Sequence, residues 1–148
     1  MTALYRKIIV ATDGTEYAQK AINTAIELSK LTGAKLYGVF VSDVSNITPT
    51  NIEWELVAEN IKREADAALS DVCKRAEAAQ IDFESVNLSG AAAQEIVQYA
   101  NKIDADLIIV GAAGKKMIER ILLGSVSEKV IRNAKQQVLV VKCPNQNE

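Results

Sequence analysis

Hydrophobic and polar positions along this 148-residue chain follow two alternating patterns. Short runs rich in Val, Ile and Leu are typical of strands buried in a sheet, and they are separated by stretches in which apolar residues recur at helical spacing. The most apolar run, residues 106–110, predicts a central strand, whereas the more polar run over 83–88 predicts an edge strand. The predicted strands cover residues 7–12, 35–41, 83–88, 106–110 and 138–141.

Helical spacing of apolar residues fills the gaps between these strands. A first helix contains Ala18 to Leu28 and ends at Gly33, which suits a left-handed C-cap. A T-x-x-E capping box at Thr50 and Glu53 opens a long helix that ends near Gln80. Three further helical segments are predicted: residues 93–103, a turn around 117–122, and a helix to Ala134 that a second capping box, Ser125 and Glu128, opens.

Strands joined by helical crossovers predict an α/β fold, a parallel, doubly wound sheet with helices on both faces. We expect one domain over 1–148, with its core in 7–142 and a polar tail in 143–148. Such sheets bind ligands at the carboxyl ends of strands where the winding direction reverses. We favour the strand order 3-2-1-4-5 because it brings together the two loops that look most functional, those after the first and fourth strands.

The glycine-punctuated run after the fourth strand, GAAGKKMIERILLGSVS from Gly111 to Ser127, carries the clearest chemistry. Glycines let backbone N–H groups approach a ligand closely, and a helix N-terminus adds unpaired donors and partial positive charge. The hydroxyls of Ser125 and Ser127 stand beside the N–H groups of Ser125, Val126 and Ser127. These features predict a polyphosphate site, although turns and a helix cap alone are the alternative explanation. There is no GxxxxGK[ST] motif, so Lys115 and Lys116 are expected to be solvated rather than phosphate lysines.

The second candidate is the turn Thr12-Asp13-Gly14-Thr15 after the first strand. A carboxylate at Asp13 suits hydrogen bonds from ribose hydroxyls or from an adenine amino group. Asp13 is equally suited to a purely structural role as a turn residue or a helix-dipole partner, and both interpretations stay open here. No paired carboxylates are apparent in the sequence, so we expect no catalytic residues.

The amino-acid composition argues against several further classes of function. The net charge of −2, from 17 basic and 19 acidic residues, argues against nucleic acid as a partner. Histidine is absent, which excludes Ser-His-Asp chemistry and histidine metal ligands. No apolar run approaches the roughly 18 residues of a membrane span. Two isolated cysteines, Cys73 and Cys143, without a signal peptide lead us to expect a cytoplasmic protein.

Three glycines and a serine, at Gly111, Gly114, Gly124 and Ser125, match the pattern G-x2-G-x9-G-[S/T]. With the continuation GSVSEKVIRNA and the turn Asp13-Gly14-Thr15-Glu16, the chain resembles the nucleotide-binding branch of the universal stress protein family from residue 7 to 142. The resemblance implies a five-stranded fold like that of the adenine nucleotide alpha hydrolases, a homodimer, and bound ATP, ADP or AMP, with Mg²⁺ or Mn²⁺ on the phosphates.

The resemblance also implies roles for individual residues. Asp13, in the turn with Thr12, would contact the ribose or adenine, and Val41 would meet adenine through its backbone. No side chain is expected to ligate the metal. Ribose and phosphates would be held by Gly111, Gly114, Gly124, Ser125, Val126 and Ser127.

The last strand predicts a dimer independently of the resemblance. It is flat and apolar, and in the favoured order it lies at a sheet edge, where an unpaired apolar strand invites aggregation. Antiparallel pairing with the same strand of a second copy would cover it in a closed assembly. The interface residues expected are Val138, Leu139, Val140 and Val141.

The prediction is therefore an ATP-binding stress-response dimer with at most slow ATP hydrolysis and with unidentified protein partners. One alternative is a hydrolase that cleaves between the α- and β-phosphates, but such enzymes use an SGG-type loop where this chain has ATDGT. A flavodoxin-like carrier, suggested by Thr12 and Thr15, is disfavoured by an aromatic content of only 5%. The third alternative is a stress protein that binds no nucleotide and acts through protein contacts alone.

Overall fold

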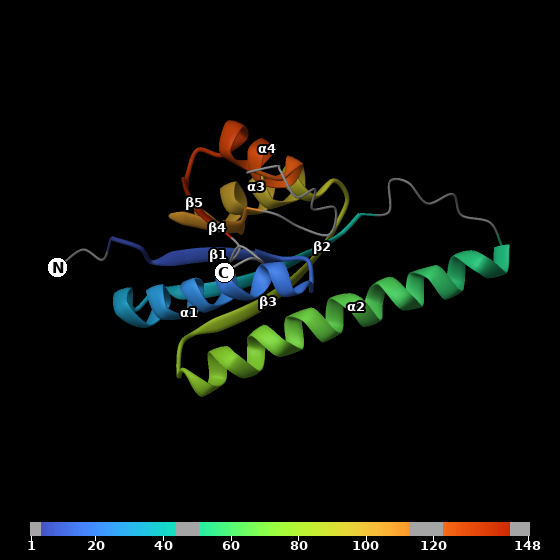
Figure 1. Cartoon of the computed structure of the whole chain (residues 1–148), viewed down its shortest axis with the longest axis horizontal. Helices are drawn as coiled ribbons and strands as arrows, with labels where there is room; N and C mark the ends of the chain where they lie inside the picture. The colour runs from blue at the N-terminus through green and yellow to red at the C-terminus, as the bar shows by residue number, and fades with distance from the viewer. Residues whose placement is uncertain (1–3, 44–50, 113–122, 143–148) are drawn as a thin grey trace, which may run out of the picture.

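A five-stranded, wholly parallel β-sheet forms the centre of the molecule (Figure 1). The computed structural model describes residues 4–43, 51–112 and 123–142. The strand order β3-β2-β1-β4-β5 confirms the predicted fold and order, and each strand end lies within one residue of the predicted one. The strands are β1 (Lys7–Thr12), β2 (Lys35–Ser42), β3 (Phe83–Ser89), β4 (Leu107–Gly111) and β5 (Gln137–Val141).

Helices cover both faces of the sheet, as predicted. After the short 3-10 helix η1 (Glu16–Ala18), α1 and α2 pack on one face, whereas α3 and α4 pack on the other (Figure 1). The four α-helices are α1 (Gln19–Thr32), α2 (Asn51–Ala78), α3 (Ala92–Ile103) and α4 (Ser125–Asn133).

The alternation of side chains along the central strands explains the two cores. In β1, Ile8 and Val10 pack in the cluster under α1, whereas Ile9 between them packs in the cluster under α3 and α4. All three are 0% exposed, because a central parallel strand is covered on both faces. The polar edge strand β3 contains no buried residue, which confirms its predicted edge position.

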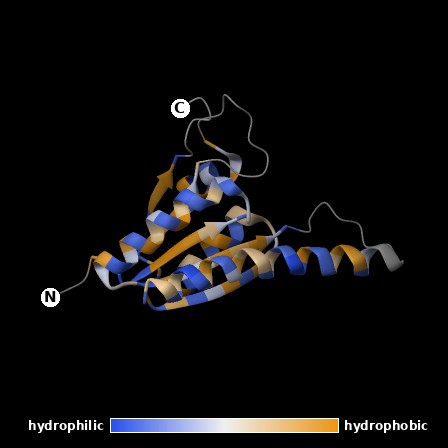
Figure 2. Cartoon of the chain, turned by 60° about the horizontal axis from the view of Figure 1, so that its bottom comes forward, coloured by the Kyte–Doolittle hydropathy of each residue, from blue (hydrophilic) through white to orange (hydrophobic). Residues whose placement is uncertain are grey.

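Helix α2 is longer than the sheet is wide. Among its described side chains, the buried ones all lie in its second half, and from Trp54 to Glu64 none is buried. Figures 1 and 2 show this first half extending beyond the sheet. The buried residues of α2 are Ala65, Ala68, Leu69, Val72 and Ala76.

Two of the predicted helix ends are confirmed, and one predicted start is wrong. Gly33 caps α1 in the left-handed conformation with φ of +74°, and Gln80 beyond α2 has φ of +59°. The capping box at Ser125 does not form: Gly124 is the N-cap, no side chain caps the helix, and a Glu128 carboxylate oxygen accepts from Arg132 at 2.7 Å instead. Thr50, the turn at 117–122 and the tail 143–148 lie outside the described residues.

Within the described ranges, no helix combines the length and the apolar character needed to cross a membrane.

Candidate functional site

The carboxyl ends of β1 and β4 lie side by side at the centre of the sheet. Val10 of β1 is in register with Ile109 of β4, and the two strands run parallel, so the end of β1 at Thr12 lies level with Gly111. From β1 the chain winds towards β2 and β3, whereas β4 and β5 lie on the other side. This is the point where the winding direction reverses, which is where open α/β sheets bind ligands.

The turn after β1 is held by its own side chains. The backbone N–H of Gly14 donates to Thr12 Oγ1 at 3.2 Å. Both the backbone N–H and the hydroxyl of Thr15 donate to Asp13 Oδ1, at 3.0 and 2.5 Å. Gly14 has φ of +79°, a conformation that favours glycine. Asp13 therefore does act as a turn residue, yet its second oxygen, Oδ2, has no hydrogen-bond partner among the described residues.

The start of α4 is tied back to the end of β4. The Ser127 hydroxyl, on a residue only 4% exposed, donates to the carbonyl of Gly111 at 2.5 Å. The Gly124 N–H donates to the Ala112 carbonyl at 2.6 Å, and the Ala112 N–H donates to Val141 at 2.9 Å. Sequence reasoning missed these bonds and left the Ser127 hydroxyl open for a ligand. The small residues on both sides of the loop were the only local signal for such a close approach.

Three backbone donors stand open at the N-terminus of α4. Among the described residues, the first N–H to find an acceptor in the helix is that of Glu128, which donates to Gly124 at 3.0 Å. The N–H groups of Ser125, Val126 and Ser127 precede it and have no such acceptor. Because no side chain caps the helix, these donors and the helix dipole favour an anion here.

The remaining predicted residues lie near this edge or outside the described part. Thr12 is in register with Phe40, so Asp13 lies level with Val41 near the end of β2. Val41 is half-buried and packs against the core beneath α3 and α4. Gly114, Lys115 and Lys116 lie outside the described residues.

A cavity of about 580 Å³ lies between α3 and α4, beside the start of α4. It shares Ser125 and Val126 with the predicted site and reaches Asp43 beyond β2. The rest of its lining is Ala91, Ala92, Ala93, Gln94, Val97, Gln98, Lys129 and Asn133.

Some titratable side chains of the described residues have raised pKa values. Within the described ranges, no three His, Cys, Asp or Glu side chains are grouped as a metal site would need. A hydrogen bond to Glu84 raises the pKa of Lys35, and burial raises the pKa of Tyr99. Lys35 is the first residue of β2, at the opposite end of the strands from the candidate site.

Comparison with known proteins identifies the family. Residues 4–142 match the sequence pattern of the Universal stress protein family. The chain belongs to this family. A universal stress protein of Methanocaldococcus jannaschii is 45% identical over 143 residues, which are 95% of this chain and 84% of that protein. A putative universal stress protein of Staphylococcus aureus is 32% identical over 140 residues, 93% of this chain and 84% of the relative.

This universal stress protein is also similar to solved structures, and two of these are complexes with a nucleotide. The hypothetical protein MJ0577 has a TM-score of 0.87 at 29% identity, covering 97% of this chain and 99% of its own. A universal stress protein in complex with cAMP has a TM-score of 0.70 at 30% identity, with 95% and 98% covered. The Archaeoglobus fulgidus protein in complex with dAMP has a TM-score of 0.65 at 26% identity, with 94% and 99% covered.

Proposed function

We propose that this universal stress protein binds an adenine nucleotide, with ATP as the expected ligand, at the carboxyl ends of β1 and β4. The observation that carries the proposal is the uncapped start of α4, which presents open N–H groups beside Gly111 at the reversal point of the sheet. The cAMP and dAMP complexes of its relatives support the adenine part of the proposal.

Each end of the nucleotide has a matching set of groups. The N–H groups of Ser125, Val126 and Ser127 would hold phosphate oxygens, with Gly111, Gly114 and Gly124 keeping side chains away from the ligand. The Ser127 hydroxyl already donates to Gly111, so its role is to fix the loop, whereas its N–H serves the ligand. Asp13, through Oδ2, would accept from the ribose or adenine, next to Thr12 and the Val41 backbone.

A divalent cation is compatible with this arrangement as a companion of the phosphates. The described residues offer no group of carboxylates for it, so Mg²⁺ or Mn²⁺ would be held by phosphate oxygens and would neutralise part of their charge. The N–H donors bind phosphate but do not activate water, and Asp13 Oδ1 is occupied by Thr15. We therefore expect at most slow hydrolysis, so nucleotide occupancy would be the signal in a stress response.

Isothermal titration calorimetry with ATP, ADP and AMP, each with and without Mg²⁺, tests the binding. We expect a micromolar dissociation constant for ATP, equivalent to about −8 kcal/mol, and weak or no binding of CTP. An absence of heat with every adenine nucleotide, in both conditions, would contradict the proposal.

We also propose that the protein is a homodimer paired through β5. This strand lies at a sheet edge and its apolar side chains include Leu139, which is 37% exposed. Val138 and Val140 pack against the core under α3 and α4, so a charge at either would test folding as well as pairing. Leu139→Lys is the cleaner variant, and Leu31→Lys on α1, where the leucine is 82% exposed, is its control.

Sedimentation velocity distinguishes the outcomes for these two variants. We expect a dimer for the wild-type chain and for Leu31→Lys, and a monomer for Leu139→Lys, because a charge at each copy of the edge repels its partner. A dimer that Leu139→Lys leaves intact would place the interface elsewhere. The cytoplasmic location expected from the sequence stays a prediction.

A further inference from the structure

We propose that Arg75 of α2 is a positioning residue for the nucleotide-binding turn at Asp13. Among the described residues, the Arg75 guanidinium bonds to Gln19, Asn23 and Asp71, none of which is assigned to the ligand. The guanidinium fixes the start of α1 against α2, and the start of α1 in turn fixes the turn. The inference rests on the proposed function and names one residue that holds the turn of the same site in position.

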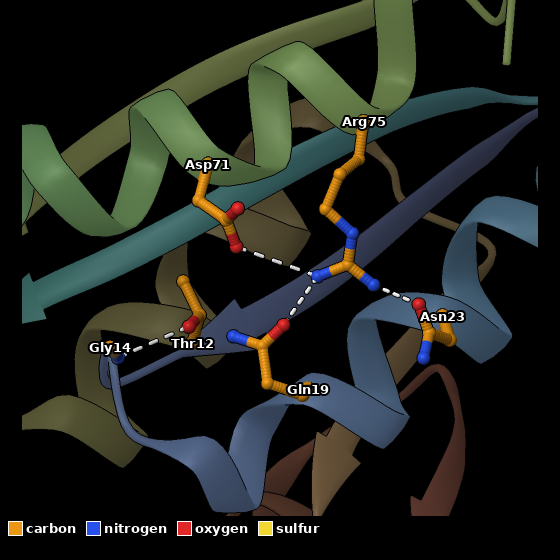
Figure 3. Close-up of polar contacts among 6 residues, drawn as sticks. All are labelled: Thr12, Gly14, Gln19, Asn23, Asp71 and Arg75. Carbon is orange, nitrogen blue, oxygen red and sulfur yellow. Dashed lines mark hydrogen bonds and ion pairs between the residues drawn. The ribbon is translucent and has the colours of Figure 1, made fainter. Parts of the chain in front are cut away.

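The guanidinium of Arg75 bridges two helices (Figure 3). Nη1 donates to Gln19 Oε1 at 2.5 Å and lies 3.5 Å from Asp71 Oδ2, on its own helix. Nη2 donates to Asn23 Oδ1, one turn further along α1. The Arg75 side chain is 25% exposed, so these bonds are shielded in part from water. A planar guanidinium that donates to acceptors in several directions holds their relative positions better than a single hydrogen bond does.

The first of these acceptors belongs to the residue that begins α1. Gln19 follows η1, in which the Ala18 N–H donates to the Thr15 carbonyl at 3.2 Å. Thr15 also provides both bonds to Asp13 Oδ1. A short chain of bonded residues therefore connects the guanidinium to the carboxylate that we assign to the ligand.

A packing contact between Gly14 and α2 supports the same turn. A Cβ added to Gly14 would lie 3.4 Å from Ala68 Cβ and 3.9 Å from Phe40 Cε2. Phe40 and Ala68 belong to a small buried cluster with Ala65 and Leu69 of α2. The turn thus lies against one part of α2, while Arg75, about two helical turns further on, ties the following helix to the same α2.

Removing the guanidinium therefore leaves the turn with its own hydrogen bonds and its packing, but without the bonds that fix the start of α1 against α2. Arg75→Met keeps the apolar stem but removes every donor, and Arg75→Lys keeps the charge with less directional bonding. We expect Arg75→Met to weaken ATP binding about five- to tenfold and Arg75→Lys to restore part of that loss. Arg63→Met is the matched control, because Arg63 lies on the part of α2 beyond the sheet with its side chain 77% exposed and only a 4.0 Å contact to Glu59.

A double-mutant cycle separates positioning from a general loss of structure. Titration calorimetry with ATP is carried out on Arg75→Met, on Asp13→Asn and on the double variant, with thermal melts to show that each is folded. If Arg75 acts through Asp13, Arg75→Met should change the affinity by less than about twofold once Asp13→Asn is present. Gln19→Met, which removes the α1 acceptor, should reproduce the Arg75→Met loss in part and serves as the second route if Arg75→Met does not fold.

Two results would overturn this inference while leaving nucleotide binding intact. One is wild-type affinity in folded Arg75→Met, or in Gln19→Met if the first variant does not fold. The other is the same loss in both backgrounds of the cycle, which would mean that Arg75 acts on the fold and not on the turn. A wild-type chain that binds no adenine nucleotide would instead overturn the proposed function, and the inference with it.

Discussion

The two loops that meet at the centre of the sheet satisfy their polar groups in opposite ways. In the turn after β1, the N–H groups of Gly14 and Thr15 are bonded to neighbouring side chains, which leaves a carboxylate oxygen of Asp13 open. At the start of α4, the Ser127 hydroxyl is bonded, which leaves backbone N–H groups open. One loop offers an acceptor and the other offers donors, as the ribose and phosphate ends of a nucleotide require.

The glycines of the two loops differ in backbone conformation. Gly14 has φ of +79°, so its lack of a side chain meets a conformational need. Gly124 has φ of −72° and ψ of 163°, which any residue adopts, so its lack of a side chain meets no such conformational need. A substitution at Gly124 therefore tests ligand binding at the start of α4 with little backbone strain.

Gly124→Val should have the largest effect. A branched side chain at the N-cap would stand between the ligand and the N–H groups of Ser125 and Val126, and losing two charged hydrogen bonds of about 1.5 kcal/mol each weakens ATP binding by about 100-fold or more. Calorimetry measures the affinity, and circular dichroism checks the fold. Ala91→Val is the control, because Ala91 is the extended N-cap of α3 and lines the same cavity, but has no assigned ligand contact. Equal affinity in Gly124→Val and the wild-type chain would remove the start of α4 from the site.

Asp13→Asn should have an intermediate effect. Asparagine keeps an oxygen that can accept from Thr15, so the turn is retained, but the charge and the open carboxylate oxygen are lost. We expect about tenfold weaker ATP binding, because one hydrogen bond to a charged group is worth about 1.5–3 kcal/mol, and a change in unfolding free energy below about 0.5 kcal/mol. Urea unfolding and calorimetry measure the two quantities. A loss of stability without a loss of affinity would leave Asp13 as a turn residue only.

Ser127→Ala should have the smallest effect on binding and a larger one on stability. It leaves the partly buried Gly111 carbonyl without its hydroxyl donor, which costs about 1–3 kcal/mol of unfolding free energy. The backbone N–H remains, so we expect ATP binding to weaken only about two- to fivefold. A loss of binding as large as that of Gly124→Val would mean that the hydroxyl itself holds the ligand.

Local patterns in the sequence were enough for the fold because each central strand is an unbroken apolar run and each helix has one apolar face. They also located the two loops, since both follow buried strands. What they missed are contacts between residues far apart in the chain. The Ser127 hydroxyl was expected to face a ligand but bonds Gly111, and the Arg75 bridge to Gln19 depends on how α1 and α2 lie together. The Ser125 capping box failed because the helix begins one residue earlier than a cap at Ser125 requires.

Backbone amide chemical shifts during titration with ATP test the central claim most directly. Two-dimensional ¹H–¹⁵N spectra of the wild-type protein should show the largest shifts at Ser125, Val126 and Ser127, with smaller ones at Asp13 and Thr15. The amides of Leu36 and Phe83, at the opposite end of the strands from the candidate site, should stay unchanged and serve as the internal reference. Saturable shifts centred on α3, or none at the start of α4, would contradict the assignment of these N–H groups to phosphate binding.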